Sequence, residues 1–162
     1  MRYNTSFTSH KLNDKRNKSI GFTLIELLLT ISILGVLVAS FVITYRSSRN
    51  NQALRTSAER LADVVRNAHV FAREAADKEG WGVVRESETT YVLVSGKESD
   101  WEPVTRYSLE RNTSFVDDFT VWFDIGTGET SANRIITIHA DSGKQISVEI
   151  IQTGVVEIST IQ

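Results

Sequence analysis

An unbroken apolar segment near the amino terminus constrains this chain more than any other feature. Residues 22–44 read FTLIELLLTISILGVLVASFVIT, and Glu26 is the one ionisable side chain among these 23 positions. A helix of about 20 apolar residues crosses the hydrocarbon core of a membrane. The segment therefore predicts a transmembrane helix over residues 22–44.

The charge around this segment predicts its orientation. Residues 1–21 carry five basic side chains and one acidic side chain, a net charge of +4, whereas the whole chain of 162 residues carries −2, which leaves −6 for the remainder. Positive charge stays on the cytoplasmic side of a membrane, so we expect the head, after residue 45, to lie outside the cytoplasm. The acidic remainder argues against nucleic acid as a partner, because phosphate binding needs clustered Lys and Arg.

A secretory signal peptide is the ordinary alternative for such a segment. The apolar run is longer than the about 7–15 residues typical of signal peptides, and no small-x-small cleavage site closes it. A signal anchor that is never cut stays open as an alternative.

Residues 46–79 are amphipathic and contain no helix breaker, so they predict a continuation of the same helix to 50 or more residues. Its apolar positions recur at spacings of four and three: Leu54, Ala58, Leu61, Val65, Ala68, Ala72 and Ala75. The arginines fall elsewhere around the helix and are expected to be solvated or ion-paired: Arg49, Arg55, Arg60, Arg66 and Arg73. Gly80 and Gly82 are expected to end the helix.

The remaining chain alternates short runs rich in Val, Ile, Thr and aromatic residues with turn residues. The predicted strands are Val83–Glu86, Thr90–Ser95, Val104–Leu109, Phe119–Asp124, Arg134–His139, Ile146–Ile151 and Val155–Ile158. A hairpin turn is expected at residues 141–144 and another turn at Gly154. The fold class is therefore α+β, a long amino-terminal helix packed on an antiparallel β-sheet head. The expected organisation is 1–21, a basic leader; 22–44, the transmembrane helix; 45–80, the amphipathic helix; and 81–162, the β-rich head.

The junction before the apolar segment carries a short motif. Gly21, Phe22 and Glu26 stand in the order Gly-Phe-x-x-x-Glu, and Lys18 lies shortly upstream. This resembles the prepilin cleavage and methylation motif that type IV pilins share with the pseudopilins of type II secretion. The resemblance implies that a prepilin peptidase cuts after Gly21 and methylates the new amino group of Phe22.

The same resemblance implies that Glu26 steers subunits into a filament. A carboxylate inside an apolar helix is costly and is usually paired. The new amino group of Phe22, from the same or a neighbouring subunit, is its natural partner. The start of a helix also favours negative charge, which would stabilise an unpaired Glu26 in part.

More loosely, the rest of the chain resembles the GspH/FimT group of minor pilins and pseudopilins. The resemblance rests on the alanine-rich residues 58–76, on the turn at Gly143 and on Gly154-Val155-Val156. Major pilins often have a proline in the stem and a cysteine pair, and both are missing here, which favours a minor subunit. The implied partners are the prepilin peptidase, other pilin or pseudopilin subunits, the membrane and assembly platform proteins. The implied location is the inner membrane, with the leader in the cytoplasm, and afterwards a filament.

Two other functions stay open, a DNA-binding minor pilin for transformation and an uncleaved signal-anchored β-domain protein. The sequence does not decide between type II secretion, a type IV pilus and competence machinery. We expect no enzymatic activity and no cofactor. The chain has no cysteine, and no glycine loop of the kind that binds nucleotide phosphates occurs.

Other polar groups predict no site. His10, His69 and His139 lack metal or catalytic spacing and are interpreted as ordinary polar residues. Asp117, Asp118 and Asp124 are interpreted as an acidic turn rather than a calcium loop. Residues 126–128, Gly-Thr-Gly, are expected to form a turn. Among the tryptophans, Trp122 is expected in the core. Trp81 and Trp101 border loops and are candidates for exposed contacts, although packing under a loop is the more common fate.

Overall fold

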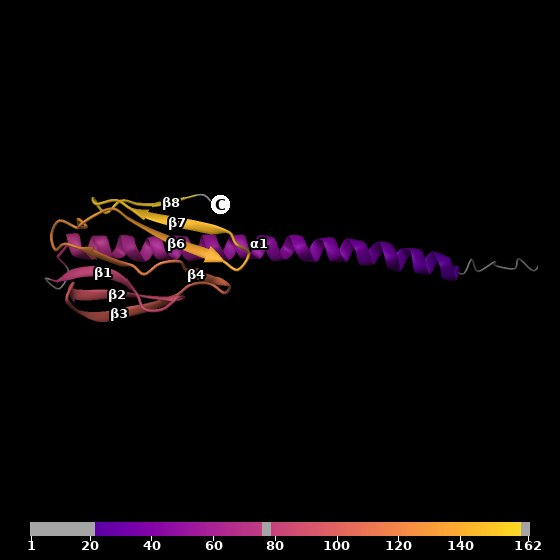
Figure 1. The fold of residues 1–162 in the computed structure, drawn as a ribbon, viewed down its shortest axis with the longest axis horizontal. Coiled ribbons are helices and arrows are strands. Elements are labelled where there is room, and N and C mark those ends of the chain that lie inside the picture. The colour runs from indigo at the N-terminus through magenta and orange to yellow at the C-terminus, as the bar shows by residue number, and fades with distance from the viewer. Residues whose placement is uncertain (1–21, 76–78, 160–162) are drawn as a thin grey trace, which may run out of the picture. The chain divides into compact units, whose positions relative to one another are not determined.

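The computed structural model describes residues 22–75 and 79–159, apart from the side chains of residues 42–44. Within these residues it contains one α-helix and eight β-strands. The chain divides into two compact units, one ending at Ser40 and one beginning at Phe41. We call residues 22–40 the stem and the second unit the head. Helix α1 (Leu24–Arg73) contributes residues to both units, and all strands belong to the head (Figure 1).

Helix α1 has 50 residues, as the sequence predicts. It crosses positions 44 and 45 without a break, so the division between a membrane part and an amphipathic part stays a prediction. In the head, six of the seven predicted face positions are fully buried: Leu54, Ala58, Leu61, Val65, Ala68 and Ala72. Three of these six buried residues are alanines, whose small side chains let the helix backbone approach the sheets closely. The five arginines predicted to lie off this face are all exposed.

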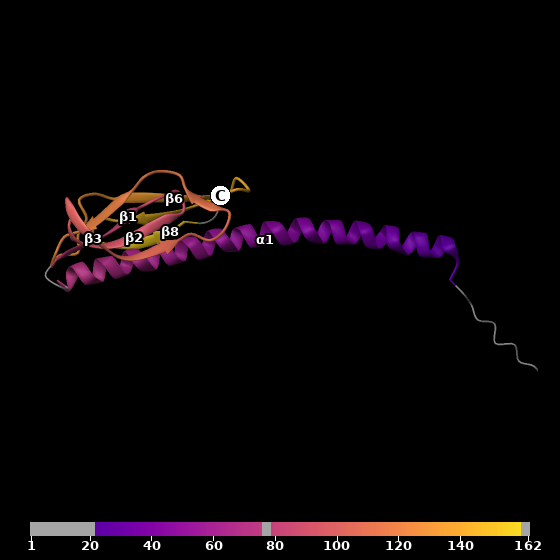
Figure 2. The same cartoon turned by 90° about the horizontal axis from the view of Figure 1, so that it is seen from below.

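The strands form two antiparallel sheets, and the sequence predicted only one. Their order is β3-β2-β1-β5 in the first sheet and β4-β6-β7-β8 in the second. In both views the sheets lie along the part of α1 that belongs to the head, and in Figure 2 the labelled strands of both sheets are on the same side of this part of the helix. The strands are β1 (Gly80–Arg85), β2 (Thr90–Lys97), β3 (Asp100–Ser108), β4 (Thr113–Phe115), β5 (Thr120–Phe123), β6 (Arg134–Ala140), β7 (Gln145–Ile150) and β8 (Val156–Ile158).

The predicted α+β class is confirmed, and the predicted strands all correspond to observed ones. One observed strand, β4, was not predicted, and it has only three residues. The turn between β6 and β7 is closed by a hydrogen bond from the Ala140 amide to the Lys144 carbonyl, 2.8 Å, with Gly143 at φ 82°. Gly154 has φ 85° in the turn between β7 and β8, as expected of a turn glycine.

Strand β3 forms the outer edge of the first sheet. Its register with β2 shifts at a bulge between Leu93 and Val94, and Val94 lies opposite Pro103. All but one of its nine residues are exposed. This edge therefore combines a proline with an irregular register.

Aromatic rings join the two sheets in the core. The ring of Tyr91 on β2 meets the ring of Phe115 on β4 edge-on, with centroids 5.9 Å apart. Tyr91 also stacks on Tyr107 of β3 at 5.4 Å, and Phe115 contacts Phe119 at 5.0 Å. Because Tyr91 and Phe115 belong to different sheets, this cluster fixes one sheet against the other.

The end of α1 differs from the prediction. The helix ends at Arg73, and Ala75 follows with φ 51°. The expected stop residues Gly80 and Gly82 lie inside β1, where the side chain of Trp122 covers them: a Cβ on Gly82 would stand 2.5 Å from the Trp122 ring. These glycines make room for a tryptophan on the neighbouring strand instead of capping the helix.

Candidate functional site

The start of α1 is built by the same residues that form the predicted processing motif. The Glu26 amide donates a hydrogen bond to Thr23 Oγ1 at 3.3 Å, and the Leu27 amide donates to the Thr23 carbonyl at 3.1 Å. Thr23 is therefore the N-cap, and Glu26 stands three residues on, which is the spacing of a capping box. The sequence analysis missed this role of Thr23, although the Thr-x-x-Glu pattern is its signal.

The stem presents an apolar surface in every direction. All its large apolar side chains are exposed, among them Phe22 at 78% and Leu24 at 76%. By length and composition α1 is able to cross a membrane, and none of its apolar window is buried within the described residues. A helix that is apolar all round requires lipid or other helices around it.

The few hydroxyl groups of the stem are satisfied within the helix. Thr30 Oγ1 donates to the Leu27 carbonyl at 2.8 Å, and Ser32 Oγ donates to the Leu28 carbonyl at 2.8 Å. Ser40 Oγ donates to the Val36 carbonyl at 3.0 Å. Because unsatisfied polar groups are costly in an apolar medium, these bonds let the stem carry hydroxyls there without an external partner.

The predicted site residues occupy the beginning of the stem. Gly21 lies outside the described residues. Phe22 precedes the helix, and Glu26 lies exposed in its first turn, where the amino end of the helix favours negative charge. The cleavage, methylation and assembly roles assigned to these residues stay predictions.

The remaining polar candidates are occupied by structural contacts. His69 packs on the Phe123 ring at 5.6 Å, and His139 Nε2 lies 3.1 Å from Ser114 Oγ. Asp118 forms an ion pair with Arg85 at 3.2 Å. No group of three or more His, Cys, Asp or Glu suited to a metal occurs among the described residues, and His10 lies outside them. Residues 126–128 form a turn, as predicted, and the Gly126 amide donates to the Ala72 carbonyl of α1 at 2.8 Å.

One of the three tryptophans differs from expectation. Trp81 follows the more common of its two expected fates: it is 6% exposed and packs on Phe71 with ring centroids 4.8 Å apart. Trp122, expected in the core, is half-buried and lies over the β1 glycines. Trp101 is 39% exposed, in line with the prediction. Neighbouring strand residues face opposite sides of a sheet, so the side each tryptophan takes depends on register that the sequence did not fix.

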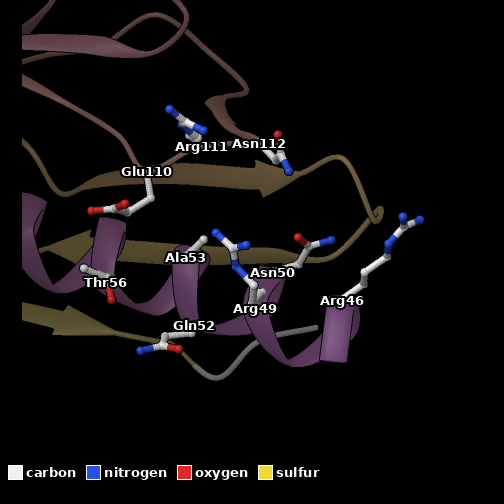
Figure 3. A pocket seen from close by; sticks show the side chains of 9 residues that line it. All are labelled: Arg46, Arg49, Asn50, Gln52, Ala53, Thr56, Glu110, Arg111 and Asn112. Atoms are coloured by element: carbon white, nitrogen blue, oxygen red, sulfur yellow. The ribbon is translucent and has the colours of Figure 1, made fainter. Parts of the chain in front are cut away.

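A basic groove lies in the head where α1 passes the turn between β3 and β4 (Figure 3). It has a volume of about 910 Å³. We call it the arginine groove, and its lining residues are Arg46, Arg49, Asn50, Gln52, Ala53, Thr56, Glu110, Arg111 and Asn112. Sequence reasoning missed it, because Arg111 is separated from the two helix arginines by more than 60 positions.

Comparison with known proteins yields one match. Residues 16–42 match the family model described as the prokaryotic N-terminal methylation motif. The match spans the predicted leader junction and most of the predicted transmembrane segment, and leaves most of the head unmatched. No curated protein and no solved structure gives a significant match.

The matched motif indicates a type IV pilin-like or pseudopilin protein. Such a motif points to a structural subunit and not to an enzyme. Together with the exposed apolar helix, it fits a membrane-anchored protein. It also points to processing by a prepilin peptidase and to assembly with other pilins.

Proposed function

We propose that this protein is a minor pilin or pseudopilin of the GspH/FimT type, which joins a type IV pilus or a type II secretion pseudopilus after its leader is removed. One observation carries the proposal: the methylation motif at residues 16–42 runs into a helix whose apolar side chains are exposed on all sides. A stem of this kind is stable in lipid before assembly and among other stems afterwards.

Cleavage after Gly21 is the switch in this proposal. The leader holds a charge of +4 at the cytoplasmic face, and its removal leaves the amino group of Phe22 as the start of the chain. Thr23 already caps the helix, so the cut leaves α1 intact. The stem is then able to leave the bilayer and pack against other stems.

Glu26 supplies the electrostatic contact of the stem. Its carboxylate lies in an apolar surface, and an unpaired charge in that setting is costly. A methylated amino group at Phe22 of a neighbouring subunit offers the opposite charge. An ion pair between Glu26 and this amino group would stabilise a subunit that docks with the start of its helix beside the start of its neighbour's helix.

Features of the head support the minor-subunit type. The alanine-rich face of α1 is buried against the sheets, and turns occur at Gly143 and Gly154. These are the features on which the resemblance to the GspH/FimT group rests. The positive charge that precedes the stem in the sequence supports a head on the outer side of the inner membrane.

The intact mass of the chain tests the cleavage step. Co-expression with an active prepilin peptidase is expected to give a chain that begins at N-methylated Phe22, and expression without it a full-length chain. Gly21→Ala is expected to stay uncut, because the motif that this chain resembles has a glycine at the position before the cut. Gly35→Ala is the matched control, since a Cβ on Gly35 meets nothing within 4 Å.

Two results would contradict the proposal. One is a full-length wild-type chain in the presence of a peptidase that cuts another prepilin. The other is cleavage beyond Ser40, which would place this protein among ordinary secreted proteins.

Substitution of Glu26 tests assembly separately from cleavage. Glu26→Gln is expected to be processed to Phe22 and yet to be depleted at least tenfold from sheared filaments, because loss of a desolvated charge pair costs about 3–5 kcal/mol. Glu98→Gln, the same change at an exposed head position, is expected to enter filaments normally. Equal incorporation of the two variants would remove Glu26 from the assembly step.

A further inference from the structure

Within the part of the chain that the structure describes, the arginine groove carries positive charge that no ion pair neutralises. Elsewhere on α1, Arg55 pairs with Glu59 at 2.9 Å and Arg66 pairs with Asp63 at 2.9 Å. By contrast, the three groove arginines form no ion pair among the described residues: Arg46, Arg49 and Arg111. The groove therefore has the charge of a site for an anion.

The one carboxylate that lines the groove is already paired. Glu110 Oε1 lies 3.4 Å from Arg60 Nη1, and Arg60 is outside the groove lining. Glu110 therefore does not cancel the charge of the three arginines. An anion that enters meets an excess of guanidinium groups, which bind phosphate oxygens well because their planar forks match them.

The wall that carries Arg111 is held firmly against the helix. The Glu110 amide donates to Ser57 Oγ of α1 at 2.9 Å, and Thr113 Oγ1 donates to the Glu110 carbonyl at 2.6 Å. Asn112 adopts φ 62°, and its carbonyl accepts a hydrogen bond from the Asp141 amide at 3.1 Å. Arg111 therefore extends from a turn that hydrogen bonds fix at both ends, and it lines the groove together with two helix arginines.

The position of the helix arginines identifies the anion. Residues 22–44 are the predicted membrane span, and Arg46 and Arg49 lie about 3 Å and about 8 Å beyond its end at the helical rise of 1.5 Å per residue. The headgroup layer on each side of a bilayer is about 5–8 Å thick. The backbone of both arginines is thus within reach of the lipid phosphates, and a spacing of three residues puts the two residues on one face of the helix.

We propose that the arginine groove binds the phosphate of an anionic phospholipid headgroup at the outer face of the membrane. This inference rests on the proposed membrane-anchored function. Binding would hold the foot of the head against the bilayer until the subunit is taken into a filament. Nucleic acid is the rival phosphate ligand, but an extended strand calls for a longer basic track than one groove beside the membrane.

The test uses the full-length chain in an uncharged detergent, with dioctanoyl phosphatidylglycerol, dioctanoyl phosphatidylcholine, inorganic phosphate and a DNA duplex as separate probes. Lipid molecules retained per chain are counted by native mass spectrometry. Arg49→Gln and Arg111→Gln are each expected to lower the affinity for phosphatidylglycerol about fivefold. Arg134→Gln is the matched control, since Arg134 is exposed, lies outside the groove and forms no ion pair among the described residues. The leader charge is the same in every variant and cancels in the comparison.

The inference would be supported if the wild type and the Arg134→Gln control prefer phosphatidylglycerol over phosphatidylcholine and both groove variants lose this preference. Equal affinity for the two lipids, an equal loss in Arg134→Gln, or displacement of the lipid by an equal concentration of inorganic phosphate would overturn it. Tighter binding of the DNA duplex at the same arginines would overturn it in favour of nucleic acid. Leader cleavage is measured on the same variants: a chain cut after Gly21 without lipid preference refutes this inference alone, and an uncut chain with lipid preference refutes the proposed function.

Discussion

Tyr91 places a hydroxyl group in the core. Its side chain is 0% exposed, and no group of the described residues forms a hydrogen bond with its hydroxyl oxygen. Burial raises the pKa of this hydroxyl well above its usual range, because the phenolate form would lose its hydration. The ring is needed for contacts with both sheets, whereas the oxygen carries a desolvation cost of about 1–3 kcal/mol.

Tyr91→Phe is therefore expected to stabilise the head by about 1 kcal/mol. The measurement is denaturant unfolding of the full-length chain in detergent, followed by tryptophan fluorescence. Tyr107→Phe is the control, because it removes a hydroxyl from the half-buried partner ring of the same stack and is expected to change stability little. A loss of stability in Tyr91→Phe would show that the hydroxyl has a partner in solution.

His69 makes the stability of the head depend on pH. Its ring lies under the turns that contain Gly128 and Gly154, and burial, followed by the nearby charge of Arg73, lowers its pKa below the ordinary 6.5. The folded head therefore binds the proton less readily than the unfolded chain. This contribution to stability is present above about pH 6.5 and is lost as pH falls toward the folded pKa.

We expect the free energy of unfolding to fall between pH 7 and pH 5 in the wild type, with a smaller fall in His69→Gln. Unfolding curves at several pH values measure the slope. His139→Gln serves as the control, since it removes a histidine while leaving His69 in place. An unchanged slope in His69→Gln would exclude His69 as its source.

Among the connecting elements, two turns offer a matched comparison. Gly143 and Gly154 both have positive φ, 82° and 85°, in turns on either side of β7. A Cβ on Gly143 meets nothing within 4 Å, whereas a Cβ on Gly154 collides with the His69 ring. Alanine at either position would have to adopt a left-handed backbone conformation, which costs about 1–2 kcal/mol.

Gly154→Ala is therefore expected to destabilise the head by about 1–3 kcal/mol more than Gly143→Ala, the excess being the cost of overpacking. Chemical denaturation of the two variants measures the difference. The double variant Gly154→Ala/His69→Ala is expected to recover much of that excess. Equal losses in the two single variants would mean that the turn moves away from His69 at no cost.

Elements with a strong local pattern were predictable, and those that depend on distant partners were not. The face of α1 follows from spacing alone, so the burial of Leu54 through Ala72 matched the prediction. The end of the helix did not match the prediction, because Gly80 and Gly82 make room for the side chain of Trp122. Trp122 is 40 positions from Gly82 in the sequence. Strand β4 has three residues, and it exists because Phe115 pairs with Ile138 of β6.

For the molecule as a whole, the residues of the predicted processing site are close together in the sequence and those of the arginine groove are not. Gly21, Phe22 and Glu26 fall within six consecutive positions, so a motif is enough to single them out. The groove unites the helix with the turn at Arg111 only after both sheets have formed. The division of the strands into two sheets was not predictable either, because the candidate strands were alike in composition.

The irregular edge at β3 has a consequence for heads held side by side. Pro103 offers no amide proton to a strand on either side, and the bulge at Leu93 breaks the even spacing that an incoming strand would need. In the proposed filament, neighbouring heads would therefore not readily join their sheets through this edge. At this edge, contacts between neighbouring heads would then be made by side chains.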